Sequence, residues 1–260
     1  MQKYKNKLYK IPANTVFIGK KLHYLPTCHS TNDIAATLIA SGHAENGMVV
    51  ITDHQTNGKG QLGNAWEAKP DENITMSVIL IPEQFQARDQ FGLTLITTVA
   101  INRIMHNLGI DVEIKWPNDI YYKGKKLGGI LIANSLTGQL LTDSIIGIGL
   151  NVNQESFEIG QAVSVKIITG RSYELSGIVS LLLKEIEECY QLFKVNPEGL
   201  KRIFLSRLMG LGKKGKFQRL PSGEEFIGVI KGVDELGRLE VLVNDKIEVF
   251  NLKEIGAKTN

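Results

Sequence analysis

A glycine-rich stretch between two apolar runs places the strongest limit on how this chain folds. Residues 52–66 read TDHQTNGKGQLGNAW, in which Gly58, Gly60 and Gly63 follow the spacing G-x-G-x-x-G. The apolar run MVVIT at 48–52 precedes it, and the run ITMSVILI at 74–81 begins roughly ten residues after the last glycine. Pro70 and Asp71 interrupt that short interval, so no crossover helix fits there. The pattern therefore predicts two neighbouring strands joined by a glycine-rich connection.

Three known phosphate-binding loops fail to match this context. A Walker A loop needs Lys-Ser or Lys-Thr after its last glycine, where this chain has Asn64 and Ala65. A dinucleotide-binding turn needs a strand that leads directly into the glycines and a helix that follows them. A protein-kinase glycine loop is accompanied by H-R-D and D-F-G motifs, which this sequence lacks.

The remaining interpretation is a connection whose backbone passes close to a ligand. Glycines allow that approach and expose N–H groups, Lys59 adds a cation, and Trp66 offers a flat face for a ring. On the glycine pattern alone, a solvent-exposed loop anchored to the core by Trp66 stays equally open.

Composition sets only broad limits. The 260 residues are 43% hydrophobic and 22% charged, enough for one large domain with or without a small second one. A net charge of +3 neither excludes nor favours nucleic acid. Cys28 and Cys189 form no C-x-x-C pair, which argues against a thiolate zinc site and suits a cytoplasmic protein. No signal peptide is expected in residues 1–17, and no run reaches the ~20 apolar residues of a membrane span.

Apolar periodicity predicts the order of the elements. Strands are expected at 21–25, 48–52, 74–81 and 112–115, followed by a hairpin of 126–135 and 140–153, and helices at 30–42, 87–108, 174–193 and 197–209. Residues 116–119 are expected to be irregular, because Pro117 has no N–H for a strand ladder. The stretch GLGKKGK at 210–216 is the best linker candidate, and 213–260 is predicted to form a small β-barrel.

Five motifs occur in an order and at a spacing that resemble one family. They are HSTN at 29–32, HQTNGKGQLGNAW at 54–66, KWPND at 115–119, KLGGIL at 126–131 and GIGLNVN at 147–153. This arrangement, which covers about residues 23–153, resembles the biotin–protein ligases. KWPND and KLGGIL at this spacing carry most of the specificity.

The resemblance implies an α+β fold with two domains. Residues 1–212 are expected to form a catalytic domain with a mixed sheet and flanking helices, similar to the core of class II aminoacyl-tRNA synthetases. Residues 213–260 are expected to form an SH3-like β-barrel. Some family members carry an N-terminal DNA-binding domain, but only about 22 residues precede the matching region here, so no nucleic-acid or operator binding is expected. A homodimer through the sheet edge and a monomer are both left open.

The resemblance also implies a two-step reaction. Biotin reacts with ATP, in the presence of Mg²⁺, to give biotinyl-5′-adenylate, and the biotinyl group then passes to a lysine of a biotin carboxyl carrier domain in a carboxylase such as acetyl-CoA carboxylase. Lys126 matches the family lysine that contacts both the carboxylate and the phosphate, and a fixed charge of this kind is worth about 3 kcal/mol in the barrier. Lys59 matches a loop arginine with a related role. Asp119 is expected either to hold Mg²⁺ or to deprotonate the acceptor lysine.

The remaining site residues follow from the same match. The residues expected at biotin are Ser30, Thr31, Asn32, Gln55, Lys59, Gly60, Gln61, Lys126 and Gly129. Those expected at ATP or the adenylate are Gly58, Gly63, Trp66, Lys115, Asn118 and Asn151.

The glycine loop departs from the arginine-rich form found in many bacterial members. Lys59, Gln61 and Asn64 stand where that form has three arginines. Neutral Gln61 removes one positive charge that would face the adenylate, so we expect the intermediate to escape more readily here. Two rival interpretations are a lipoate–protein ligase, which shares the adenylation chemistry, and a non-catalytic biotin or nucleotide sensor. KWPND and the C-terminal barrel favour biotin, and the intact Lys126, Asp119 and Lys115 favour an enzyme.

Overall fold

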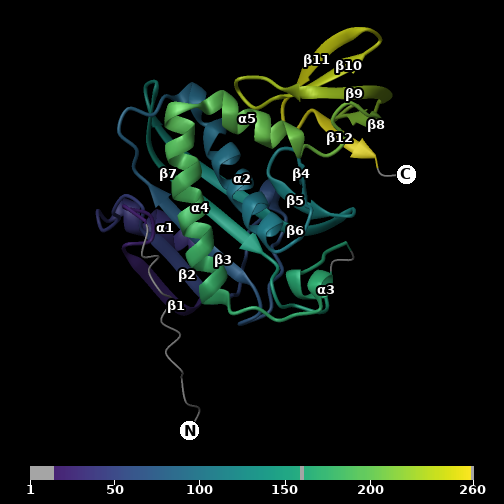
Figure 1. The fold of residues 1–260 in the computed structure, drawn as a ribbon. Coiled ribbons are helices and arrows are strands. Elements are labelled where there is room, and N and C mark those ends of the chain that lie inside the picture. The colour runs from purple at the N-terminus through teal and green to yellow at the C-terminus, as the bar shows by residue number, and fades with distance from the viewer. Residues whose placement is uncertain (1–14, 159–160, 259–260) are drawn as a thin grey trace.

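A seven-stranded mixed sheet forms the centre of the protein. The computed structural model describes residues 15–158 and 161–258 (Figure 1). The strands are β1 (Leu22–Cys28), β2 (Val49–Gln55), β3 (Ile74–Leu80), β4 (Glu113–Lys115), β5 (Asp119–Tyr122), β6 (Lys125–Thr137) and β7 (Leu140–Leu150), in the order β1-β2-β3-β7-β6-β5-β4. β1 pairs parallel to β2, and all other pairs are antiparallel. The predicted mixed sheet is confirmed, as is the direct pairing of β2 with β3.

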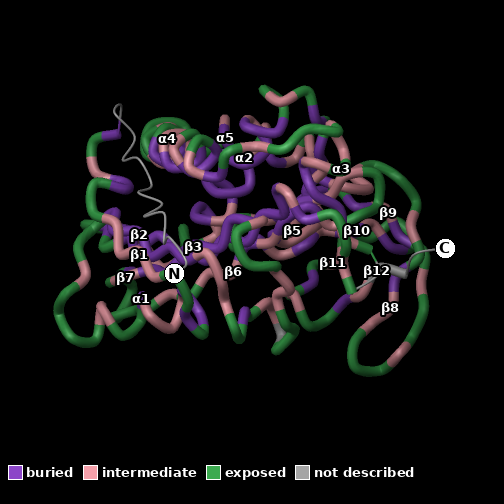
Figure 2. Tube along the Cα trace, turned by 90° about the horizontal axis from the view of Figure 1, so that it is seen from below, coloured by how far each residue is buried: buried purple, intermediate pink, exposed green. Residues whose placement is uncertain are grey.

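Helices cover both faces of this sheet. Those of at least ten residues are α1 (Thr31–Ala40), α2 (Phe91–Asn107), α4 (Leu175–Val195) and α5 (Pro197–Ser206). Figure 2 shows α2, α4 and α5 on one face and α1 on the other. The main core lies under the three helices, whereas α1 packs on a smaller cluster built around Ala35, Val50 and Ile79. Alternating residues of β2 and β3 therefore pack into two separate cores, one on each face of the sheet, because both faces are buried.

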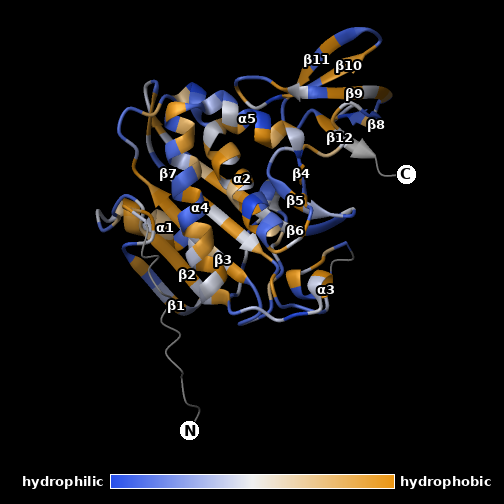
Figure 3. Ribbon diagram, in the orientation of Figure 1, coloured by the Kyte–Doolittle hydropathy of each residue, from blue (hydrophilic) through white to orange (hydrophobic). Residues whose placement is uncertain are grey.

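Local signals explain where α1 begins and how closely α2 approaches α4. Ser30 caps α1 by accepting a hydrogen bond from the Asp33 N–H at 3.5 Å. At Gly92 of α2, a Cβ atom would lie 2.2 Å from the Phe193 ring of α4. Only glycine allows the two helices to pack at this distance. In Figure 3, hydrophobic colour covers much of the central strands and alternates with hydrophilic colour along α4.

A second, antiparallel sheet occupies the C-terminal end of the chain. Its strands are β8 (Lys214–Arg219), β9 (Glu225–Val233), β10 (Leu239–Val243), β11 (Lys246–Phe250) and β12 (Ile255–Lys258), in the order β11-β10-β9-β8-β12. The predicted β-rich tail is confirmed. This part of the chain contacts the region of the large sheet at Trp116, whose Nε1–H donates to the Gly237 carbonyl oxygen at 2.8 Å.

Two parts of the element prediction were wrong. The irregular stretch is shorter than expected, because Asp119 already belongs to β5, which pairs with both β4 and β6. The missing N–H of Pro117 affects only the turn between β4 and β5. A short helix, α3 (Val165–Thr169), also went unpredicted, because five residues give too little periodicity to detect.

Two expectations concern features that the structure tests only in part. The region expected to lack a signal peptide is mostly residues 1–14, which lie outside the described residues. Within 15–158 and 161–258, no helix combines the length and hydropathy needed to cross a membrane.

A buried carboxylate fastens the first described residues to α4. Glu187, which is 5% exposed, accepts hydrogen bonds from the backbone N–H groups of Val16, Phe17 and Ile18. Replacing Glu187 with alanine would leave these N–H groups without their acceptor, so we expect the free energy of unfolding to fall by about 2 kcal/mol. Urea denaturation measures this change. Glu188→Ala, which removes an exposed partner of Lys184, is the control, and equal midpoints for the two variants would contradict the prediction.

Candidate active site

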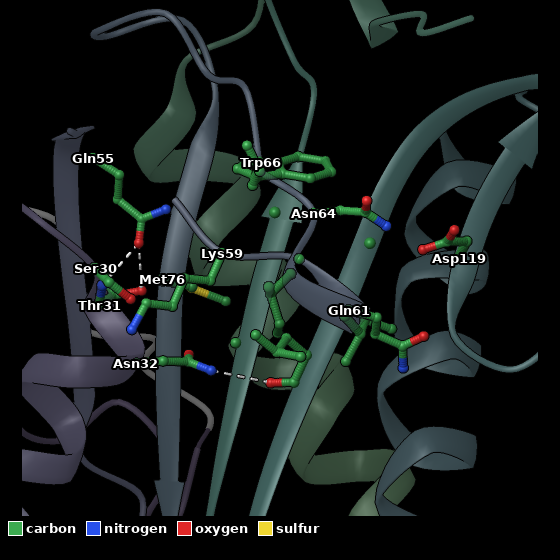
Figure 4. A pocket seen from close by; sticks show the side chains of 18 of the residues that line it. Ser30, Thr31, Asn32, Gln55, Lys59, Gln61, Asn64, Trp66, Met76 and Asp119 are labelled. Carbon is green, nitrogen blue, oxygen red and sulfur yellow. Dashed lines mark hydrogen bonds between the residues drawn. The ribbon is translucent and has the colours of Figure 1, made fainter. Parts of the chain in front are cut away.

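A cavity of about 170 Å³ opens over the middle of the large sheet. Its walls come from the start of α1, the end of β2, the glycine-rich loop, and β6 and β7. All nine residues predicted to contact biotin line this cavity. Figure 4 shows Ser30, Thr31, Asn32 and Gln55 at one end, with Gln61 and Asp119 toward the other. Sequence segments that lie more than 90 residues apart therefore form one site.

A network of polar groups forms the end of the cavity beside α1. The Thr31 N–H and hydroxyl both donate to Gln55 Oε1, at 2.8 and 3.1 Å. Ser77 Oγ, on β3, lies 2.7 Å from Thr31 Oγ1 and 2.6 Å from Asn32 Oδ1. Asn32 also donates to the Leu131 carbonyl oxygen at 3.3 Å. These contacts fix hydroxyl and amide groups that can serve a ligand needing both donors and acceptors.

The glycine-rich loop folds back as a small hairpin over the cavity. The Gly60 N–H donates to the Asn64 carbonyl oxygen at 2.7 Å, and the Trp66 N–H donates to the Gly58 carbonyl oxygen at 2.9 Å. This pairing sets the Trp66 ring over Gly149 of β7, where a Cβ atom would lie 2.3 Å from the ring. The Trp66 Nε1–H is buried and has no hydrogen-bond partner among the described residues. The ring is thus a flat wall whose position depends on a glycine beneath it.

Lys126 and Asp119 form an ion pair inside the cavity. Lys126 Nζ lies 2.8 Å from Asp119 Oδ1 and 5.7 Å from the centroid of the Trp66 ring. Asp119 on β5 stands directly opposite Gly129 on β6, and a Cβ atom at Gly129 would lie 3.2 Å from both Asp119 Oδ1 and Lys126 Cε. Gly129 therefore leaves the space through which the lysine side chain reaches the carboxylate. Both side chains are partly exposed, so the pair remains accessible to a ligand.

Lys59 lines the same cavity, but its ammonium group pairs with α1. Lys59 Nζ lies 2.8 and 2.7 Å from the two carboxylate oxygens of Asp33, and His29 Nε2 is 3.5 Å from Asp33 Oδ2. Asp33 was not predicted as a site residue. The Lys59 side chain is about half exposed and that of Asp33 about one-third, so this ion pair is weak. A ligand anion that binds Lys59 must compete with the Asp33 carboxylate.

Only one of the six residues predicted at the nucleotide reaches the wall of this cavity. That residue is Trp66. Lys115 instead places its ammonium group 5.0 Å from the centroid of the Tyr121 ring. Asn151 is 2% exposed and donates to the carbonyl oxygens of Val163, at 3.2 Å, and Lys126, at 3.5 Å. It therefore supports the backbone of Lys126.

The other three residues predicted at the nucleotide lie in the loop or beside a strand. Gly58 and Gly63 help to shape the loop, and Asn118 borders a second cavity. Nucleotide contacts by these residues remain predictions.

Several residues that shape the site had weak sequence signals. Gly147 and Gly149 lie two apart on β7 and so share one face of the strand. A Cβ atom at Gly147 would lie 2.3 Å from Asn32 Oδ1. The alternating glycines in the GIG stretch therefore indicated, from sequence alone, a strand face without side chains on which other groups can pack. The contacts of Ser77 and Asp33 depend on tertiary packing and had no comparable signal.

Neither of the two cysteines lines this cavity. Cys28 and Cys189 are free and buried. Burial raises the pKa of the Cys28 thiol, and that of Cys189 to about 12. Both therefore stay protonated at neutral pH and are poor nucleophiles or metal ligands.

Comparison with known proteins gives a consistent result. Residues 24–151 match the Biotin/lipoate A/B protein ligase family. A bifunctional ligase/repressor BirA of Bacillus spizizenii is 32% identical over 233 residues, which is 86% of this chain and 70% of the relative. A biotin–[acetyl-CoA-carboxylase] ligase of Mycobacterium tuberculosis is 28% identical over 244 residues, covering 91% of this chain and 88% of the relative.

A solved structure extends the match beyond the motif region. The biotin protein ligase of Aquifex aeolicus in complex with biotin and ATP superposes with a TM-score of 0.74 at 26% identity, covering 93% of this chain and all of that one. The shared fold, the site lined by all nine expected residues and the similarity to the Bacillus relative lead to the same assignment. The chain belongs to the biotin–protein ligase family.

Proposed function

We propose that this protein activates biotin as biotinyl-5′-adenylate and transfers it to a lysine of a biotin carboxyl carrier domain. The observation that carries the proposal is Lys126, which is held between Asp119 and the Trp66 ring at the edge of a cavity whose far end is polar. The names of the Mycobacterium and Aquifex relatives, which refer to acetyl-CoA carboxylase, biotin and ATP, support the same substrates and acceptor.

The cavity provides a different environment for each part of the reactants. The hydroxyl and amide groups around Thr31 and Gln55 suit the ureido ring, which both donates and accepts hydrogen bonds. That places the carboxylate toward Lys126. One carboxylate oxygen attacks the α-phosphorus of ATP, and pyrophosphate leaves. Since two anions must approach each other, the fixed cation lowers the barrier by offsetting their repulsion.

The second step transfers the acyl group. The neutral acceptor amine attacks the carbonyl carbon of the mixed anhydride, an amide C–N bond forms, and the C–O bond to AMP breaks. The ammonium form of lysine must lose protons along this path. Asp119 lines the cavity and is the carboxylate placed to receive one, which is the first of its two proposed roles.

The second proposed role of Asp119 is to bind Mg²⁺. This ion is usually held by one or two carboxylates together with substrate phosphates, so a single aspartate fits that donor set. Among residues 15–158 and 161–258, no group of three or more histidine, cysteine, aspartate or glutamate side chains could hold a metal. Asp119 and the phosphates of the nucleotide would hold the ion, which would supply further charge neutralisation there.

Ligand-dependent exchange of labelled pyrophosphate into ATP tests the proposed function. Exchange that requires biotin, followed by transfer of biotin to a carrier domain, is the expected result. Exchange supported by lipoate and not by biotin would favour the lipoate ligase instead. Biotin binding without exchange would favour a non-catalytic sensor.

Further features of the protein belong to the same proposal. The C-terminal five-stranded sheet would be an SH3-like barrel, with the domain boundary between residues 212 and 213, one residue before β8 begins. Two free, buried thiols support a reducing compartment such as the cytoplasm. Sedimentation separates a homodimer through an edge of the large sheet, where β1 and β4 lie, from a monomer. A gel shift at physiological salt tests for operator-like DNA binding, which we do not expect.

Gln61 gives a prediction about how the intermediate is held. Gln61→Arg should slow the release of biotinyl-adenylate, measured without a carrier domain, by up to about fivefold, since a partly exposed charge pair is worth ~1 kcal/mol. Gln61→Met, a neutral side chain of similar length, should release the adenylate at the wild-type rate. Equal release rates for the arginine and methionine variants would contradict the prediction.

A further inference from the structure

A second cavity adjoins the first, and neither step of the proposed reaction uses it. It encloses about 280 Å³ between the large sheet, the start of α2 and the turn that joins β9 to β10. Gln61 lines both cavities. Asn118 lines the second cavity, and the next residue, Asp119, lines the first. A molecule in the second cavity would therefore lie beside the carboxylate of the active site.

The lining of the second cavity is polar but almost uncharged. It carries the amide side chains of Gln61, Gln90, Asn118, Asn134 and Asn251. The charged side chain in the lining is Arg238, and its guanidinium group already binds Asp234 Oδ2, through Nε and Nη2 at 2.7 Å each. Burial acts to raise the pKa of Asp234, but hydrogen bonds from Arg238 outweigh it and lower the pKa, so the carboxylate is ionised at neutral pH. The described lining therefore offers no unpaired cation.

The wall on the C-terminal side is held firmly in place. Trp116 binds the Gly237 carbonyl oxygen, and a Cβ atom at Gly237 would lie 2.1 Å from the Phe91 ring. Asp234 Oδ1 accepts hydrogen bonds from the N–H groups of Leu236, at 3.0 Å, and Arg238, at 2.8 Å. This turn cannot approach the core more closely, so the cavity exists before any ligand arrives.

One buried acceptor in the wall has no partner. Asn118 is 3% exposed, and its Nδ2 donates to the Ile130 carbonyl oxygen. Its Oδ1 atom is buried and accepts no hydrogen bond from any described residue. A buried acceptor without a donor costs about 1–3 kcal/mol, so this part of the wall would be stabilised by a ligand N–H group that reaches Oδ1.

We propose that the second cavity holds the stretch of the acceptor polypeptide that flanks the target lysine, an inference that rests on the proposed function. Amide side chains pair with peptide N–H and C=O groups, while Trp116 and the exposed Leu236 offer apolar contact. A pyrophosphate or triphosphate group would need unpaired cations, which this lining lacks. The target lysine extends past Gln61 to Asp119, where the acyl group is transferred.

The two half-reactions separate this role from a role in activation. Leu236→Asp places a charge at the lip of the cavity, at a side chain that is 51% exposed and so tolerates the change. We expect the KM for the carrier domain to rise about tenfold, because a charge at an apolar contact disrupts docking. Biotin-dependent pyrophosphate exchange and transfer of biotin from the adenylate to hydroxylamine should keep their wild-type rates.

Leu220→Asp is the matched control. Leu220 is 42% exposed at the end of β8 and does not line the cavity, so the same added charge there should leave the KM for the carrier unchanged. A photo-crosslinking residue at position 236 should capture the carrier domain, and one at position 220 should not.

Three results would overturn the proposal. They are slower pyrophosphate exchange in Leu236→Asp with an unchanged KM for the carrier, an equal rise in that KM in Leu220→Asp, and equal crosslinking at both positions. A wild-type protein without biotin-dependent exchange would instead refute the proposed function itself, and this inference with it.

Discussion

Replacing Lys126 with alanine is expected to slow biotin-dependent pyrophosphate exchange by about a hundredfold to a thousandfold. Its ammonium group lies 2.8 Å from Asp119 and faces the Trp66 ring, at the point where the biotin carboxylate would meet the nucleotide. Loss of one preorganised group that stabilises developing charge costs roughly 3 kcal/mol in the barrier. The alanine variant also leaves Asp119 as an unpaired negative charge beside two anionic substrates, which adds to the repulsion.

The neighbouring lysine provides the control for this prediction. Lys125 precedes Lys126 on β6 and is exposed. Lys125→Ala removes an equal charge from the same strand and should leave the exchange rate within about twofold of wild type, as surface substitutions generally do. Because the Lys126 side chain is about one-third exposed, the alanine variant should also keep its melting temperature. A slower pyrophosphate exchange in this variant would then reflect a slower chemical step and not unfolding. An exchange rate in Lys126→Ala close to that of Lys125→Ala would contradict the assigned role.

A single methyl group at Gly149 is expected to raise the KM for ATP by roughly tenfold to a hundredfold. The Cβ atom would lie 2.3 Å from the Trp66 ring, a distance that real contacts do not reach, so the ring must shift. Stacking of a base on an aromatic ring is worth about 1–3 kcal/mol, and we propose that Trp66 stacks on the adenine. Biotin binding should change little, because the hydrogen bonds around Thr31 and Gln55 do not involve the Trp66 ring.

Gly177→Ala is the matched control for this methyl group. Gly177 lies in α4, and a Cβ atom there would meet nothing within 4 Å. That variant should bind ATP normally and be slightly more stable, since alanine favours a helix over glycine. Steady-state kinetics at saturating biotin, with calorimetric titration of biotin alone, measures both effects. Loss of biotin affinity with an unchanged KM for ATP would place the Trp66 ring against biotin instead.

The sequence predicted most reliably those features that depend on short intervals of chain. The gap between the runs at 48–52 and 74–81 has no room for a crossover helix, and β2 and β3 do pair directly. The hairpin predicted to turn near residue 137 is β6 and β7. Both outcomes follow from chain length and apolar periodicity, which act locally.

Features set by tertiary contacts were harder to predict. The pairing of Lys59 with Asp33 joins residues 26 apart, and nothing in either local pattern indicates that they meet. Asn151 donates to the carbonyl oxygens of Lys126 and Val163, a packing role that its motif did not indicate, and its expected contact with the nucleotide stays a prediction. The strand β5 has four residues and begins just after a proline, so local propensity gave it no support and only pairing with β4 and β6 defines it.

The biotin end of the site, as the resemblance predicts it, gathers in one cavity, whereas the predicted nucleotide end does not, and contacts with either ligand remain predictions. Six of its nine residues come from the start of α1, the end of β2 and β6, the other three come from the glycine-rich loop, and all nine line the first cavity. The nucleotide residues include two glycines that shape the loop and three side chains on or beside strand ends, whose direction depends on packing. Spacing along the chain does not determine that direction.

A crystal structure with biotin and a non-hydrolysable ATP analogue tests the central claim most directly. We expect Lys126 Nζ within about 3.2 Å of both a biotin carboxylate oxygen and an α-phosphate oxygen, the ordinary reach of a charge-assisted hydrogen bond. Lys59 should have left Asp33 for the same anions. A structure in which both ligands are bound but Lys126 is still paired only with Asp119, and in which neither lysine ammonium group lies near an anionic oxygen of the ligands, would contradict this role of the two lysines.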